Sequence, residues 1–121
     1  MLALPQVPLT RTRAEIFDDL VLDAVEDLEH RFGADLSGLE FAVEQVPPRE
    51  AGSEFGPDVV MDRGVPLGRL YRDGLPGAPG PVIVLYRRPV EARTRDQADR
   101  GEVVFAVVAE LAAEYLGRDL G

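Results

Sequence analysis

Three glutamates near the end of the chain have types and spacing that could do chemistry. Glu102, Glu110 and Glu114 are separated by multiples of four residues, so a helix would carry them as one narrow stripe on a largely apolar surface. Glu110 and Glu114 stand one turn apart, and with Asp119 as a third oxygen ligand they could contact a hard cation such as Mg²⁺ or Ca²⁺. Two carboxylates would not make a good zinc site.

The inventory of other metal ligands is short. The chain has no cysteine, which excludes a cysteine-based zinc site, a thiol nucleophile and a disulfide framework. Its one histidine, His30, follows Glu26 by four residues near the end of an acidic helical segment, so we expect it to face solvent.

The carboxylates of Glu110 and Glu114 need contact with solvent, a cleft or cationic partners, because burying them unpaired would be costly. They could line a solvent-filled cleft or pair with arginines, lie on plain surface, or bind a metal. The stretch 63–100 has eight arginines against four acids and could supply the partners. Arg87 and Arg88 are candidates for the cleft, or for ion pairs with the acidic helix or the glutamate stripe.

Two long helices are predicted to position these groups. Thr12 and Glu15 form a capping-box pattern, an apolar stripe at helical spacing runs from Phe17 to Phe32, and Gly33 fits a C-terminal cap. Seven acids between residues 15 and 29 fill the other face, either as solvated surface or as a docking face for a basic partner. A second capping pattern over 94–97 predicts a helix that ends at Gly117 and is buried on most sides.

Strands are predicted on both sides of a long loop. Residues 39–46 alternate between apolar and polar types, and the apolar run 82–87 indicates a strand buried on both faces. Residues 47–81 hold many glycines and prolines and are predicted to be a loop region, interrupted by a short strand at 69–71, that shapes a cleft.

Size and charge limit the function classes. With 121 residues, the chain is predicted to form one domain, 1–121, which includes an N-terminal arm over residues 1–11. A formal charge of −9 argues against nucleic acid or anionic membranes as partners. No signal peptide or membrane-spanning run is visible, so we expect a cytoplasmic protein.

The order of these elements carries a resemblance. An amphipathic helix and a strand lead to a loop with Gly-Val-Pro-Leu-Gly (64–68), then to a strand ending in Leu-Tyr-Arg-Arg-Pro (85–89) and a long helix ending at Gly117. This resembles the small bacterial zincin-like metallopeptidases, a minimal matrixin-like family. The resemblance implies an α+β fold with two long helices packed on a small mixed sheet of three or four strands.

This chain departs from the catalytic motif of that family. The family carries His-Glu-x-x-His on its last helix, with two zinc-binding histidines and a glutamate as general base. In the register anchored on Gly117, Glu110 and Glu114 replace the histidines and Leu111 replaces the base. In the register shifted by one, Glu110 keeps the base position while Ala109 and Ala113 replace the histidines. We favour the first register, since it keeps both the glycine and the polar pair.

The resulting prediction is a degenerate member of the family without zinc, cofactor or peptidase activity, whose residual cleft binds a peptide or protein. Its cleft residues would be Glu102, Glu110, Glu114, Arg87 and Arg88. The alternative is an active metallopeptidase with a carboxylate metal site made of Glu110, Glu114 and Asp119. A third hypothesis places function on the acidic face of residues 15–29. The sequence does not indicate an oligomeric state.

Overall fold

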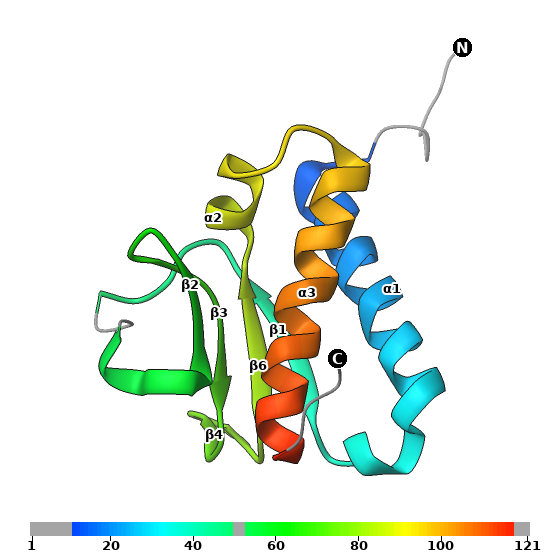
Figure 1. Cartoon of the computed structure of the whole chain (residues 1–121), viewed down its shortest axis with the longest axis vertical. Helices are drawn as coiled ribbons and strands as arrows, with labels where there is room; N and C mark the ends of the chain where they lie inside the picture. Colours follow the sequence, from blue (N-terminus) through cyan, green and yellow to red (C-terminus); the bar gives the residue numbers. More distant parts are fainter. Residues whose placement is uncertain (1–10, 50–52, 118–121) are drawn as a thin grey trace.

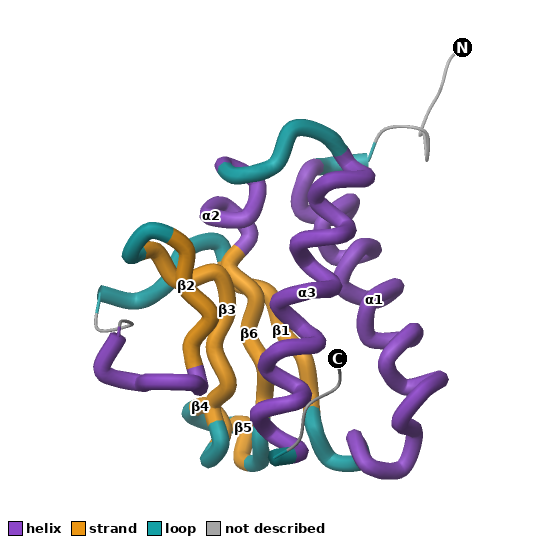
Figure 2. Tube along the Cα trace, viewed as in Figure 1, coloured by secondary structure: helices purple, strands orange, loops and turns teal. Residues whose placement is uncertain are grey.

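Two long helices lie on the same side of a mixed sheet (Figures 1 and 2). The computed structural model describes residues 11–49 and 53–117. The helices are α1 (Arg13–Phe32) and α3 (Gln97–Leu116). The main sheet has the order β1-β6-β3-β2, formed by β1 (Glu40–Glu44), β6 (Val82–Tyr86), β3 (Val65–Tyr71) and β2 (Val59–Asp62). The predicted α+β class and the mixed sheet of three or four strands are confirmed.

Smaller elements connect these layers. They are the 3-10 helices η1 (Gly33–Leu36) and η2 (Ser53–Asp58), a two-stranded ribbon of β4 (Gly74–Leu75) and β5 (Ala78–Pro79), and the short helix α2 (Arg87–Ala92). None of the helices within 11–49 and 53–117 combines the length and the hydropathy that a membrane crossing requires.

Helix α1 begins as its sequence predicts. The Thr12 hydroxyl accepts a hydrogen bond from the Glu15 amide at 3.0 Å, and the Glu15 carboxylate accepts one from the Thr12 amide at 2.8 Å. These bonds to Thr12 hold the pKa of the Glu15 carboxyl below its usual value. At the other end, Gly33 caps the helix with a positive φ of 30°.

The start of α3 corrects the sequence prediction. Its N-cap is Asp96, whose side chain accepts a hydrogen bond from the Asp99 amide at 2.8 Å. The Thr94 hydroxyl instead donates to the Val90 carbonyl at 3.0 Å, and it accepts from Arg100 Nε at 2.9 Å. Thr94 therefore closes the end of α2, a helix that the sequence did not predict, and the N-cap of α3 lies two residues later, at Asp96.

Strand β6 is one of the two inner strands of the main sheet. It pairs in parallel with β1 and antiparallel with β3, and all five of its residues are buried, which confirms the prediction of a strand covered on both faces. Ile83 and Leu85 belong to the core under the helices, whereas Val82, Val84 and Tyr86 face the other side. The strand ends at Tyr86, because Arg87 already begins α2.

The prediction of a long loop over 47–81 is wrong apart from its short strand at 69–71, which is the end of β3. Strand β2 and the whole of β3 lie within this stretch, joined by a tight turn in which Arg63 and Gly64 have φ values of 51° and 81°. Pro66 sits within β3 opposite Met61, next to a shift in the β2–β3 register, where a residue without an amide proton is tolerated. Gly64 in the turn and Pro66 at the register shift therefore belong to a β-hairpin, although glycine and proline in this stretch suggested a loop.

Gly68 lets α3 lie directly on the sheet. A Cβ atom at this position would come within 2.7 Å of Val107 Cγ1, 3.1 Å of the Val84 carbonyl and 3.2 Å of Leu111 Cδ1. These distances leave no space for a side chain, so the close approach of α3 to β3 depends on this glycine.

Candidate functional site

The glutamate stripe of α3 does not form a single site. Glu102 is exposed and borders a hollow between α1 and α3, together with Asp23 and Phe105. Glu110 is also exposed but lines a different hollow, between α3 and strand β2. Glu114 lies one turn further along, with 35% of its side chain exposed. Of the three, only Glu110 therefore lines the hollow next to β2, while Glu114 pairs with Arg72.

The hollow between α3 and β2, which we call the cleft, is small and has a mixed lining. Its volume is about 350 Å³. Apolar side chains from α3, β2 and the neighbouring β3 line it, among them Val60, Met61, Leu67, Val103, Ala106 and Val107. Glu110 belongs to its α3 wall and Asp62 to its β2 wall. Such a space suits one or two side chains of a ligand better than a whole small molecule.

Arg93 fixes one end of the cleft. Its Nε donates to Asp62 Oδ2 at 2.7 Å, and its Nη2 donates to the Asp62 carbonyl at 3.3 Å. Its Nη1 donates to the Pro89 carbonyl at 3.1 Å, so one guanidinium ties the end of β2 to helix α2. Glu110 has no ion pair within the described residues and remains available at the cleft.

Arg72 is the ion-pair partner of Glu114. Its Nε and Nη2 donate to the two carboxylate oxygens of Asp58, both at 2.9 Å, and Nη2 also donates to Glu114 Oε2 at 3.1 Å. These contacts, chiefly the hydrogen bonds to Asp58, raise the pKa of the Arg72 guanidinium above its ordinary value. A cation of the protein itself therefore occupies the position beside Glu114.

The two arginines singled out from the sequence lie elsewhere. Arg87 is buried and pairs with Glu91 of its own helix at 3.1 Å, not with the acidic helix or the glutamate stripe. Arg88 is exposed, and neither residue lines the cleft. Arg72 and Arg93 take those roles, and the only signal for them in the sequence was membership of the arginine-rich stretch 63–100.

The metal candidates do not come together. Within the described residues, no three His, Cys, Asp or Glu side chains lie close enough to hold a metal ion. Asp119, the third ligand considered above, lies outside the described residues. His30 is exposed in the last turn of α1, as its spacing predicted.

Comparison with known protein families identifies the family of this chain. The family model of the zincin-like metallopeptidases matches residues 36–119, which span β1 to the end of α3. The chain belongs to the zincin-like metallopeptidase family. No curated protein matches the chain.

The two candidate positions for the general base of the family motif differ in their exposure on α3. Leu111, the base position in the register anchored on Gly117, is fully buried in the core, where a side chain could not reach a substrate. Glu110, the base position in the shifted register, lines the cleft. The zinc-ligand positions of that shifted register are Ala109 and Ala113, both of which are partly buried and have no donor atom.

The residues present do not fit the zinc of the family in either register. In the first, Glu114 is already bound by Arg72, and Glu110 alone is a poor zinc site. In the second, methyl groups stand at both ligand positions. We therefore derive no hydrolytic step through a metal.

Proposed function

We propose that this zincin-like protein neither holds zinc nor hydrolyses peptides, and that its cleft binds a segment of a peptide or protein. The observation that carries the proposal is the ion pair between Arg72 and Glu114, because a guanidinium takes the place that a metal cation would need. The methyl groups of Ala109 and Ala113 support the same conclusion for the other register.

The lining of the cleft suits part of an extended chain. Strand β2 is an edge strand that pairs only with β3 in the described sheet, so its outer side can accept hydrogen bonds from another strand. The apolar wall of Val60, Val103 and Val107 can receive one apolar side chain, and Glu110 can pair with a basic group next to it. In the shifted register Glu110 is the former general base, kept as a recognition residue.

Metal analysis and activity test the first half of this proposal. The purified full chain is expected to contain zinc well below one equivalent and to leave a fluorogenic peptide library intact, with or without added Zn²⁺, Mg²⁺ or Ca²⁺. Stoichiometric zinc together with hydrolysis that a chelator abolishes would falsify it. Hydrolysis that depends on Mg²⁺ or Ca²⁺ and is lost in Glu110→Gln and Glu114→Gln would establish the competing carboxylate site instead.

A matched pair of variants tests the second half. Peptides selected from a display library against the wild-type chain are expected to lose binding to Ala106→Arg, because Ala106 lines the cleft and is exposed. Ala98→Arg is the control, since Ala98 is exposed on the same helix but borders the hollow next to α1. Equal loss in both variants, or in neither, would contradict binding at the cleft.

A further inference from the structure

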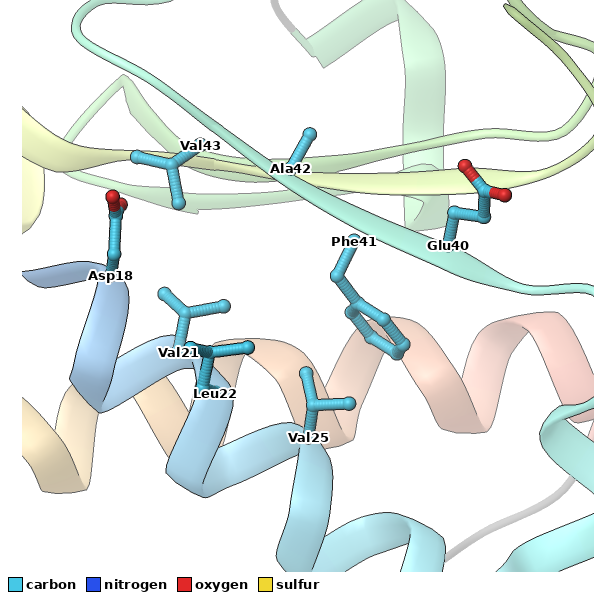
Figure 3. Close-up of a pocket in the computed structure, with 8 residues that line it drawn as sticks. All are labelled: Asp18, Val21, Leu22, Val25, Glu40, Phe41, Ala42 and Val43. Carbon is cyan, nitrogen blue, oxygen red and sulfur yellow. The ribbon is translucent and has the colours of Figure 1, made fainter.

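A second groove lies on the opposite edge of the sheet, between α1 and β1. It has a volume of about 630 Å³, larger than the cleft beside α3. Phe41 and Val43 point from β1 towards α1, and side chains of α1 point back at them (Figure 3). One of these, Leu22, has 64% of its surface exposed, although it is a large apolar residue.

Strand β1 offers free backbone groups along this groove. It is an edge strand that pairs only with β6 in the described sheet. The Glu40 amide donates to the Pro81 carbonyl at 3.1 Å, so the backbone groups of Glu40, Ala42 and Glu44 point towards β6. Because these directions alternate along a strand, the amides and carbonyls of Phe41 and Val43 point to the open side.

The ends of the groove are acidic. Asp18 lies beside Val43 at one end and Glu40 lies at the other (Figure 3). Neither carboxylate takes part in an ion pair within the described residues, and no arginine or histidine lines the groove. The groove therefore combines an apolar middle, a strand edge and two negative ends.

We propose that this groove binds an extended segment of a partner protein, which adds to β1 as a further strand of the sheet. Its backbone would pair with Phe41 and Val43, and its alternate apolar side chains would pack against Leu22 and Val25 of α1. Arginine or lysine residues at both ends of the segment would face Asp18 and Glu40. This site is separate from the cleft, because β1 and β2 are opposite edges of the sheet.

A second copy of the chain fits the groove poorly. Two β1 edges that pair about a two-fold axis at Ala42 would place Glu40 opposite Glu44 of the other copy, twice. The acidic faces of the two α1 helices would also approach each other. Like charges in those positions oppose association, whereas a basic segment satisfies them.

Binding of a defined peptide tests the proposal. The probe is a fluorescein-labelled peptide, Arg-Thr-Val-Thr-Val-Arg, added to the full chain and followed by fluorescence anisotropy. In antiparallel pairing with β1, its first arginine lies on the valine face towards Asp18, and its last arginine lies on the opposite face beside Glu40. We expect saturable binding that weakens with salt and that is at least about tenfold tighter than for the same peptide with glutamate at both ends. A version with N-methylated valines, which keeps the side chains but loses the strand hydrogen bonds, should not bind.

Variants of α1 locate the site. Leu22→Arg and Asp18→Arg should each weaken binding by about tenfold or more, because they fill the groove or reverse the charge at its end. Asp23→Arg makes the same charge change on the α3 side of α1 and should leave binding unchanged. Both wild-type and variant chains should keep the same circular dichroism spectrum and melting temperature, since these residues are exposed.

Four outcomes would overturn the proposal. They are no saturable binding to the wild-type chain, equal losses in Asp18→Arg and Asp23→Arg, full binding of the N-methylated peptide, and a wild-type dimer that Leu22→Arg converts to a monomer. Equal losses would mean that the acidic helix attracts cations without using the groove. The dimer would mean that a second copy is the occupant. None of these results bears on the cleft, where Ala106→Arg is the test.

Discussion

The guanidinium of Arg72 lies 3.1 Å from the carboxylate of Glu114 and joins the end of β3 to the last turns of α3. Asp58 holds the same guanidinium from the other side at 2.9 Å. The three groups form a closed acid–base–acid set. A cation of the protein itself therefore lies beside Glu114, where the register anchored on Gly117 would need a metal.

Removing that cation should open the position to an external one. In Arg72→Met the carboxylates of Asp58 and Glu114 lose their shared partner, so Ca²⁺ or Mg²⁺ should raise the melting temperature of the variant but not of the wild type. Because the pairs are partly exposed, the variant itself should lose only about 0.5–1 kcal/mol of stability. Thermal melts with and without each ion measure both effects. The double variant with Glu114→Gln should lose the response to ions; if it keeps the response, the ion binds elsewhere.

Histidines restored on α3 should distinguish the two motif registers. Ala109→His with Ala113→His rebuilds His-Glu-x-x-His around Glu110, and two imidazoles one turn apart bind zinc. Glu110→His with Glu114→His places the imidazoles where Arg72 competes and Leu111 is buried. We expect tighter zinc binding, measured by calorimetry, in the Ala109→His/Ala113→His variant, because the burial of Leu111 and the pairing of Glu114 with Arg72 argue against the register that the sequence favoured. Tighter binding in the second pair would instead support the register anchored on Gly117.

Gly68→Ala should destabilise the fold. The added methyl group would meet Val107 Cγ1 at 2.7 Å and would push α3 away from β3. Overpacking of this kind costs about 1–3 kcal/mol, measurable as a lower midpoint of urea unfolding. Gly101→Ala is the control within the same layer, because its methyl group would find only Leu20 Cδ2 at 3.5 Å. That change should stabilise α3 by up to about 1 kcal/mol, and equal losses in both variants would argue against a specific contact at Gly68.

Tyr86 should make the protein sensitive to alkali. Its fully buried ring and its hydrogen bond to the Tyr71 hydroxyl at 3.1 Å raise the pKa of the Tyr86 phenol. Above about pH 10 the phenol ionises in the unfolded chain but stays protonated in the folded one, so stability falls by up to about 1.4 kcal/mol per pH unit.

Tyr86→Phe should remove this loss of stability at alkaline pH. At neutral pH the variant should be about 1 kcal/mol less stable than the wild type, because it lacks the hydrogen bond to Tyr71. Urea unfolding of both proteins at neutral and alkaline pH provides the comparison. If the two stability curves stay parallel above about pH 10, the buried phenol is not the group responsible.

Local signals in the sequence predicted much of the fold. The capping box of Thr12 and Glu15, the apolar run of β6 and the left-handed Gly117 at the end of α3 each depend on neighbours along the chain, and all three are present. The β2–β3 hairpin was missed because Pro66 and the Arg63–Gly64 turn lie close together, and such residues usually indicate loops.

The candidate site was less accessible to sequence reasoning. The sequence shows directly that the stretch 63–100 is rich in arginine. It does not show which arginine pairs with Glu114, because that depends on where β3 ends relative to α3. Arg87 and Arg88 lie at the end of the predicted strand, yet the chain turns into α2 at that point and Arg87 pairs with Glu91. The partner of a surface carboxylate is set by tertiary geometry, which no spacing rule encodes.

The parallel pairing of β1 with β6 has a consequence for how the molecule is made. Glu40 lies opposite Val82, so the first strand within the described residues pairs with the last strand of the main sheet. During synthesis α1 and β1 emerge early, but β1 has no neighbour until the chain has grown past Tyr86, and α1 then still waits for α3. The N-terminal third of the protein must therefore remain unfinished until the C-terminal half arrives, and any product that stops before β6 would leave the edge of β1 and the apolar stripe of α1 uncovered.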